Sequence, residues 1–286
     1  MNTKIYLKKF ASICKRGTYA DFNKLCRQKG SFIPAKLYKY STLNPWVIKN
    51  LQRKQIYLSS PEDFNDPFDT FNVGHELQES ALKRLEIMTG IPLSTLLDDN
   101  RKEQFGEVIN DGYKEHPGFR NATGVCCFTE KSPDNIIMWS HYANQHKGIC
   151  LEYDFAKHND IIRSLYPVLY RDKYIIRKLP EKPKEHILYD RDQVMLLLIQ
   201  AHLVKSTEWE HEKEWRFLRH INDGNREINI ALNPTHIYLG LNIDKLPDEE
   251  QSILRHLKQF AEKNYIPISQ MKRSKNEYSL YPTKSE

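Results

Sequence analysis

The sequence lacks any long hydrophobic run. No window approaches the roughly 18 uncharged apolar residues that a membrane-spanning helix needs. The first residues carry Lys4, Lys8 and Lys9 without the apolar segment that follows such charges in a secretory signal. We therefore expect a soluble, cytoplasmic protein without a membrane partner.

Cysteine is also scarce, with five in 286 residues, and no two form a CxxC pair or a Cys/His ligand spacing. The missing spacing argues against zinc, and the odd number argues against a disulfide framework. Cys126, Cys127 and Cys150 lie in apolar, strand-like runs, where reduced cysteine usually acts as a small hydrophobic residue. We therefore expect no metal.

Acidic residues are nearly absent from the first 40 positions, which hold ten Lys or Arg and the single acid Asp21. Aromatic residues, among them Tyr6, Phe10 and Phe22, are interleaved with these charges. One interpretation is that the basic residues of 4–39 bind nucleic acid, with rings that stack on bases. The other is a pair of solvated helices whose rings face the core, which we favour because charge runs usually solvate a face.

The residues that are present suit a folded protein, because 40% are apolar and 28% are charged. Apolar periodicity predicts helices at 3–29, 45–53, 133–143, 191–205 and 248–263, and a helical hairpin at 75–113. It predicts strands at 35–40, 55–59, 124–128, 148–153, 166–170, 212–219, 236–239 and 266–271.

Strands spread along the chain, with helices of varied length between them, favour an α+β fold. We expect a mixed, mainly antiparallel central sheet with flanking helices. Residues 1–34 are predicted to form basic helices packed on one domain of residues 35–286, which would contain the helical insertion at 75–113.

The first polar segment is the loop 59–69, which contains four acids and two prolines. Asn, Asp and Pro form turns through their own backbone, so a purely structural loop is one explanation. Binding groups also concentrate on rigid loops, which makes Ser59, Asn65, Asp66 and Asp69 candidates for a site.

The second polar segment is 138–148, where a predicted helix turns into a strand. His141 and His146 are five residues apart, which does not place them on one helical face. His141 alone has the reference pKa of a general acid or base. A hydrogen-bonded structural histidine is the commoner alternative.

The third polar segment is the predicted strand at 212–219. Alternation places Glu212, Glu214 and Arg216 on one face and Trp215 and Phe217 on the other. Two carboxylates on one face can raise each other's pKa, whereas the arginine favours the charged form of its neighbour. An exposed strand with salt bridges is the alternative. Because each polar cluster ends an apolar element, we expect all three segments to meet in one cleft.

Several motifs follow one another across residues 37–240: Leu37-Tyr38-Lys39-Tyr40, Asn65-Asp66-Pro67-Phe68-Asp69, Cys127-Phe128, Met138-Trp139-Ser140-His141-Tyr142-Ala143, Cys150-Leu151-Glu152-Tyr153 and the 210–217 strand. In this order they resemble the bacterial family known as domain of unknown function 2971 (DUF2971).

A more distant resemblance is to the layout of ADP-ribosyltransferases. It implies that Tyr38 or Tyr40 on an early strand and Ser59 on the next grip a nicotinamide nucleotide. It also implies that a late glutamate, Glu212 or Glu214, binds the ribose and guides its transfer. The chain departs from the classical pattern, because the first segment has no Arg or His and no Ser-Thr-Ser run follows residue 58.

The expected function is that of an ADP-ribosyltransferase-like transferase or glycohydrolase acting on NAD or a related nucleotide. Glutamates 212 and 214 and His141 are the catalytic candidates. Tyr38, Tyr40, Ser59, Asn65, Asp66 and Arg216 are the candidates for cofactor binding. A toxin or phage-defence role would suit consumption of NAD. Two alternatives remain, a nucleic-acid-binding protein without catalysis and a hydrolase that uses His141 with Asp66 or Asp69.

Overall fold

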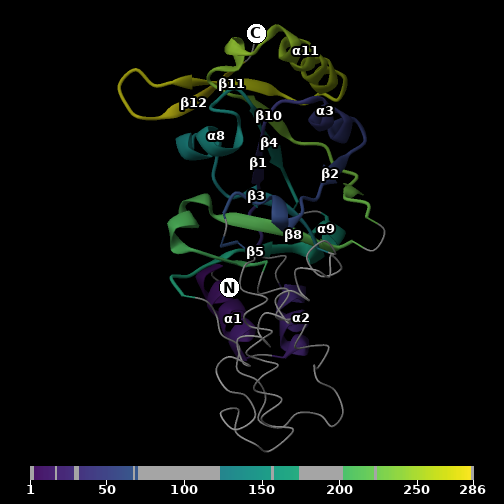
Figure 1. Cartoon of the computed structure of the whole chain (residues 1–286), viewed down its shortest axis with the longest axis vertical. Helices are drawn as coiled ribbons and strands as arrows, with labels where there is room; N and C mark the ends of the chain where they lie inside the picture. The colour runs from purple at the N-terminus through teal and green to yellow at the C-terminus, as the bar shows by residue number, and fades with distance from the viewer. Residues whose placement is uncertain are drawn as a thin grey trace, which may run out of the picture.

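A computed structural model describes residues 3–16, 18–28, 32–66, 68–69, 123–155, 158–173, 202–221 and 224–284 (Figure 1). The helical insertion expected at 75–113 and most of the helix expected at 191–205 lie outside these residues. In the described part of the chain, no helix has the length and apolar character that crossing a bilayer requires.

The basic N-terminal region forms two helices, α1 (Thr3–Arg16) and α2 (Tyr19–Gln28). They separate at Thr18, whose hydroxyl accepts from the backbone N–H of Asp21 at 3.1 Å, while its own N–H donates to the Asp21 carboxylate at 2.9 Å. This reciprocal pair caps α2. The rings of Tyr6, Phe10 and Phe22 are buried, so the prediction that these aromatics face the core is confirmed.

The helices α1 and α2 pack against chain from the middle of the sequence. The ring of Phe22 stacks on Tyr166 with 5.7 Å between centroids, and Leu169 and Leu203 belong to the same apolar cluster. The N-terminal region therefore covers one end of the central sheet with apolar side chains.

The next unit is β1 (Leu37–Ser41), α3 (Pro45–Gln52) and β2 (Gln55–Tyr57). Asn44 caps α3, because its side-chain oxygen accepts from the N–H of Val47 at 3.0 Å, and Pro45 occupies the first turn. This helix start was predicted from the Asn-Pro pair. Strand β2 pairs with β9 (Glu227–Asn229) in a separate two-stranded sheet, whereas Ser59 returns to the main sheet beside Val125.

The central sheet has eight strands in the order β12-β11-β10-β4-β1-β3-β8-β5. Its strands besides β1 are β3 (Thr123–Thr129), β4 (Ile149–Tyr153), β5 (Leu165–Pro167), β8 (Glu214–His220), β10 (His236–Leu239), β11 (Ile268–Arg273) and β12 (Leu280–Lys284). The pair β10–β11 is parallel, and the other neighbours run antiparallel. The predicted α+β class with a mixed, mainly antiparallel sheet is confirmed.

Helices cover the two faces of this sheet unequally (Figure 1). On one face, α3 and α11 (Asp248–Lys263) pack over a large core that includes Leu37, Trp215 and Leu257. On the other face, the short helix α8 (Ile136–Tyr142) packs Trp139 against Tyr40. The alternating side chains of β1, β3 and β8 are therefore divided between an apolar core and a polar face.

The turn from α8 into β4 is unusually tight. Asn144, Gln145 and His146 all have positive φ, and Gly148 donates its N–H to the carbonyl of Ala143 at 2.8 Å. A Cβ on Gly240 would lie 2.1 Å from the carbonyl oxygen of His146. The loop after β10 thus fits against this turn only because residue 240 has no side chain.

Replacing Gly240 by Ala is expected to lower the free energy of unfolding by about 1 to 3 kcal/mol, the usual cost of overpacking. The obstructing atom belongs to the backbone and cannot rotate away. Urea unfolding measures the change. Gly224→Ala is the comparison, because no atom lies within 4 Å of the added Cβ and only the φ of 73° strains the alanine. We expect it to lower the free energy of unfolding by about 1 kcal/mol. Wild-type stability in Gly240→Ala would contradict the close approach.

Several predicted boundaries differ from the structure. The strand expected from residue 212 begins at Glu214, and the one expected at 166–170 is divided into β5 and β6 (Leu169–Tyr170). Residues 204 and 205, predicted as the end of a helix, form β7 (Val204–Lys205), which pairs in parallel with β6. The sequence pattern missed β9, β12, α9 (Asn159–Ser164) and the 3-10 turns Pro61–Asp63, Thr207–Glu212 and Ile243–Lys245.

Candidate functional site

A cavity of about 370 Å³ opens on the polar face of the sheet, and all three predicted polar segments contribute to its wall. The predicted site residues that line it are Tyr38, Tyr40, Ser59, Asn65, Asp69, His141, Glu212, Glu214 and Arg216. The expected convergence of the loop, the histidine and the late glutamates is therefore observed. Asp66 is the predicted site residue that is not among them.

Strand β8 and the turn before it supply the charged wall. Glu214 and Arg216 share a face of β8, as alternation predicted, and Trp215 and Phe217 are buried in the core on the other face. Glu212 reaches the same cavity differently, because it ends a 3-10 turn and Lys213 follows in a left-handed conformation with φ of 47°. The prediction that Glu212 lies on the strand was wrong, whereas the prediction that it lies in the same cleft as the other polar segments is confirmed.

Arg216 is the centre of a buried ion network, with its side chain 1% exposed. Its terminal nitrogens donate to the two oxygens of Asp69 at 2.8 and 2.6 Å. Its Nε and a terminal nitrogen donate to the two oxygens of Glu214 at 2.8 and 3.0 Å, and the carbonyl of His202 accepts a further bond at 2.8 Å. Two bidentate carboxylate contacts and a carbonyl fix the guanidinium plane.

Glu212 is held by different partners. The Tyr142 hydroxyl donates to one of its carboxylate oxygens, and Lys205 Nζ donates to the other at 2.8 Å. Lys205 also lies 3.5 Å from the Glu214 carboxylate and 3.7 Å from that of Asp69. The network therefore joins three carboxyl groups to two cations, which leaves one excess negative charge when all are ionised.

The ionised forms of this network stabilise one another. Burial acts to raise the pKa of Glu214, but the charges of Arg216 and Lys205, with hydrogen bonds from Arg216, outweigh it and lower the pKa to about 2. Burial acts to lower the pKa of Lys205, but the surrounding carboxylates raise it above its usual value. The expectation that the arginine favours the charged form of its neighbour is thus confirmed for Glu214, where the cations outweigh any raising of the pKa by a second carboxylate.

The early strand supplies two tyrosines with different surroundings. The Tyr40 hydroxyl donates to the carbonyl of Ser132 at 2.9 Å, and its ring meets Trp139 edge to face. Burial and the nearby Glu152 carboxylate raise the pKa of Tyr38 to about 12, so its hydroxyl stays protonated at neutral pH. Both rings belong to one apolar cluster and both line the cavity, so either tyrosine can contact a ligand there.

The three candidates of the 59–69 loop, Asn65, Asp66 and Asp69, have different environments. Asn65 lines the cavity, whereas Asp66 is buried and accepts the N–H of Phe68 at 2.9 Å. Asp69 gives both oxygens to Arg216. The hydrolase alternative needs a carboxylate that can orient His141, and Asp69 is already committed to the arginine.

His141 lies at the cavity with an exposed side chain. Its ring is 6.4 Å from that of Trp209 and 6.1 Å from that of Tyr142. His146 instead turns toward Ser140, with 3.1 Å between its Nε2 and the hydroxyl oxygen. Within the described ranges, no group of three or more His, Cys, Asp or Glu side chains is placed to hold a metal ion.

Sequence reasoning missed two residues that complete the site, Tyr142 and Lys205. Tyr142 follows His141, and its presence in the same motif was a usable signal. Lys205 carried no local signal, because its pattern indicated the end of a helix. A buried lysine in this position is explained only by the three carboxyl groups that surround it.

Residues 138–217 match the family model described as protein of unknown function (DUF2971). No curated protein and no solved structure matches the chain significantly. The matched segment contains His141, Tyr142, Lys205, Glu212 and Arg216, so it supplies most of the charged wall of the cavity. The match covers this segment of the chain and agrees with the family that the motifs indicated.

Proposed function

We propose that this protein is an enzyme of the cytoplasm that binds NAD or a related nucleotide and acts on its ribosyl bond, as an ADP-ribosyltransferase-like transferase or a glycohydrolase. The observation that carries the proposal is the position of Glu212. Its carboxylate lies at the cavity wall, held by Tyr142 and Lys205, within a network that has one excess negative charge.

The excess charge matches the chemistry. Cleavage of a ribosyl bond passes through an oxocarbenium-like state, in which positive charge develops on the ribose. A preorganised carboxylate in a cavity of low dielectric stabilises such a charge more than water does. Arg216 holds both oxygens of Asp69 and both of Glu214, whereas Glu212 contacts no guanidinium among the described residues, so we assign contact with the ribose to Glu212.

The remaining wall offers groups of the types that the reaction requires. The rings of Tyr38, Phe64 and Phe128 line the cavity and would exclude water from a leaving nicotinamide. By analogy with the ADP-ribosyltransferase layout, Tyr38 contacts the base, Ser59 contacts the nucleotide and Glu212 orients the ribose. His141 at the cavity edge can take up or deliver a proton.

The proposal is tested by incubating the protein with NAD and measuring nicotinamide release. Glu212→Gln is expected to reduce the rate on the order of a hundredfold, corresponding to roughly 3 kcal/mol of lost transition-state stabilisation. The fold should survive, because removal of this charge leaves two carboxyl groups facing two cations. Thermal unfolding of the variant checks that it is intact.

Glu210→Gln is the matched control, because Glu210 is an exposed carboxylate paired with Lys213 two residues before Glu212. It should leave the rate unchanged. Glu214→Gln is a poorer test, because it removes a bidentate partner of buried Arg216. No nicotinamide release by the wild type, or an unchanged rate in folded Glu212→Gln, would refute the proposal.

If NAD is consumed, we extend the proposal to a toxin or phage-defence role, because a cell that loses its NAD stops growing. Growth of a host that expresses the wild type or Glu212→Gln measures this directly. The variant should be the less toxic of the two.

A further inference from the structure

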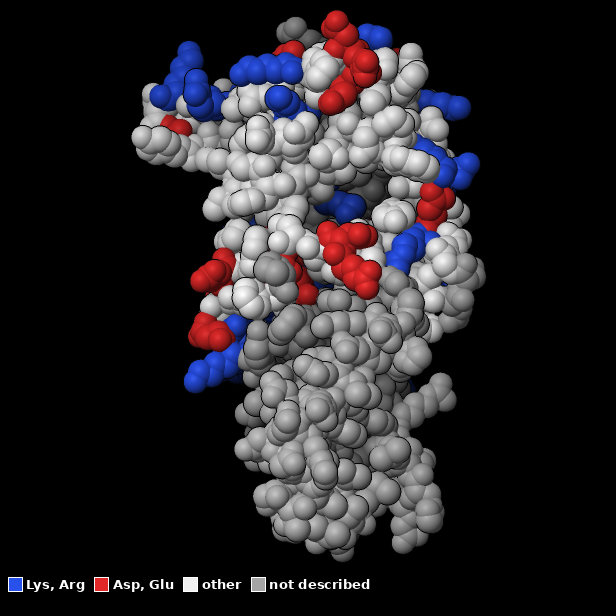
Figure 2. All heavy atoms as spheres, viewed as in Figure 1, with Lys and Arg blue, Asp and Glu red and all other residues white. Residues whose placement is uncertain are grey.

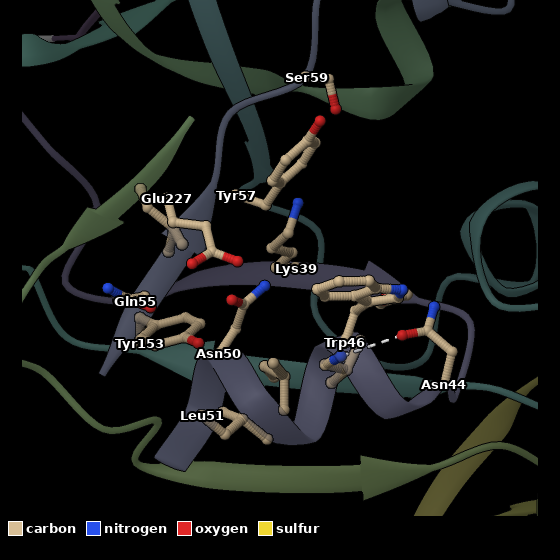
Figure 3. Close-up of a pocket in the computed structure, with 14 residues that line it drawn as sticks. Lys39, Asn44, Trp46, Asn50, Leu51, Gln55, Tyr57, Ser59, Tyr153 and Glu227 are labelled. Carbon is tan, nitrogen blue, oxygen red and sulfur yellow. Dashed lines mark hydrogen bonds between the residues drawn. The ribbon is translucent and has the colours of Figure 1, made fainter. Parts of the chain in front are cut away.

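A second cavity, of about 620 Å³, lies between β1, α3 and β2, with Glu227 of β9 at its edge (Figure 3). It shares Lys39 and Ser59 with the first cavity. Strand β1 pairs with β3 at one register position, Tyr38 with Thr129, and Ser59 pairs with β3 further along. The two cavities thus meet where β1 and β3 part.

Two large aromatic rings are exposed at this second cavity. Trp46 is 64% exposed and Tyr57 is 47% exposed, and both line it. The ammonium of Lys49 lies 4.6 Å from the centre of the Trp46 ring, which steadies the indole. Exposed rings at a cavity wall are a surface on which a planar ligand can stack.

The cavity also holds two buried acceptors that lack a donor. Asn50 Oδ1 and Gln55 Oε1 are buried and have no hydrogen-bond partner in the described part of the chain. Buried polar atoms without a partner are uncommon in folded proteins. The Glu227 carboxylate is not in this condition, because Lys49 contacts it at 2.8 Å and Arg53 at 3.7 Å. A planar ligand with N–H donors would supply what the two amides lack once their side chains rotate toward the cavity.

The end of the cavity that adjoins the first one carries a lysine, Lys39. Lys39 Nζ donates to the carbonyl of Cys127 at 3.5 Å, and no carboxylate of the described residues lies within 4.0 Å of it. Figure 3 shows its ammonium and the hydroxyls of Tyr57 and Ser59 directed toward this end. In Figure 2 a hollow near the position of β1 and β2 contains basic atoms. Such a set of donors suits a phosphate.

We propose that the larger cavity binds an adenine nucleotide. The base stacks on Trp46 and Tyr57, its amino group donates to the side chains of Asn50 and Gln55, and Lys39 with Ser59 binds the phosphate. This inference rests on the proposed function for how NAD is oriented. NAD would extend from the larger cavity past Lys39 into the first cavity, with its nicotinamide ribose beside Glu212.

Calorimetric titration of the full chain with AMP tests the site. Trp46→Ala should weaken AMP binding about tenfold or more, because stacking of one base contributes that much. Lys39→Met should weaken AMP binding about tenfold and leave adenosine binding unchanged, because it removes only the charge that faces the phosphate. Tyr265→Ala removes a 96% exposed ring that lines neither cavity and should bind AMP like the wild type.

Inosine monophosphate tests the amide contacts, because a carbonyl replaces the amino group of the base. It should bind about tenfold more weakly than AMP, and equal affinity would overturn the role of Asn50 and Gln55. Absence of AMP binding, or wild-type affinity in both Trp46→Ala and Lys39→Met, would overturn the whole inference.

These outcomes are separate from the test of the proposed function, because AMP has no nicotinamide bond. Glu212→Gln should therefore bind AMP as the wild type does. AMP binding without nicotinamide release would support this site and reject the proposed reaction. Release of nicotinamide without AMP binding would do the reverse.

Discussion

Replacing Arg216 by Met is expected to lower the free energy of unfolding by about 3 to 5 kcal/mol, the usual cost of removing one partner from a buried ion network. Methionine keeps an unbranched chain like the aliphatic stem of arginine but removes every Arg216 donor to Asp69 and Glu214. Lys205 then remains as the single cation of the network, with its Nζ 2.8 to 3.7 Å from the three carboxyl groups. Urea unfolding at neutral pH measures the loss.

Arg219→Met is the matched control, because Arg219 lies on the same strand and is exposed. Surface substitutions of this kind usually change the free energy of unfolding by less than about 0.5 kcal/mol. If Arg216→Met were as stable as Arg219→Met, the network would contribute nothing to the fold.

The pH dependence gives this prediction a second readout. In the wild type the pKa of Glu214 is lowered to about 2, so Glu214 contributes stability above its unfolded pKa of about 4.5, and this is lost as the pH falls toward 2. Without Arg216, burial raises the pKa of Glu214, and the folded variant gains stability when that carboxyl group is protonated. The difference between wild type and variant should therefore narrow as the pH is lowered from neutral.

Elements with strong local signals were predicted well from the sequence. The helix at 248–263 and the strand at 236–239 have the predicted bounds. In α11, three acids occupy the first turn and Lys263 the last, and the buried residues Leu254, Leu257 and Ala261 recur at helical spacing. Local charge and apolar periodicity suffice where an element buries one continuous stripe.

The parts of the fold that depend on distant pairing were not predicted. Strand β7 has two residues and exists because Val204 and Lys205 pair with Leu169 and Tyr170. Likewise a strand was predicted at 55–59, but its pairing with β9 outside the main sheet was not. The periodicity of so short a strand does not identify its partner, and the partner decides the outcome.

The composition of the candidate site was predicted from the sequence, and its electrostatics only in part. The segments that contain Ser59, His141 and Glu214 do meet, because each polar run ends an element of the same sheet face. Alternation predicted that Arg216 would favour the charged form of Glu214, but the contribution of Lys205 was missed because the sequence pattern assigned that residue to a helix. Ion networks depend on distances of a few ångströms between remote residues, and residue spacing along the chain does not determine these.

Trp215→Ala should also cost about 3 to 5 kcal/mol of unfolding free energy, the usual range for an aromatic residue truncated in a core. Trp215 is 1% exposed, and its indole N–H donates to Glu130 at 2.6 Å. Trp46→Ala makes the same chemical change on an exposed ring and should leave stability nearly unchanged, while it weakens AMP binding. Chemical unfolding of the two variants checks the contrast. If both lost stability equally, Trp46 would be part of the core, and its effect on AMP binding could not be assigned to stacking.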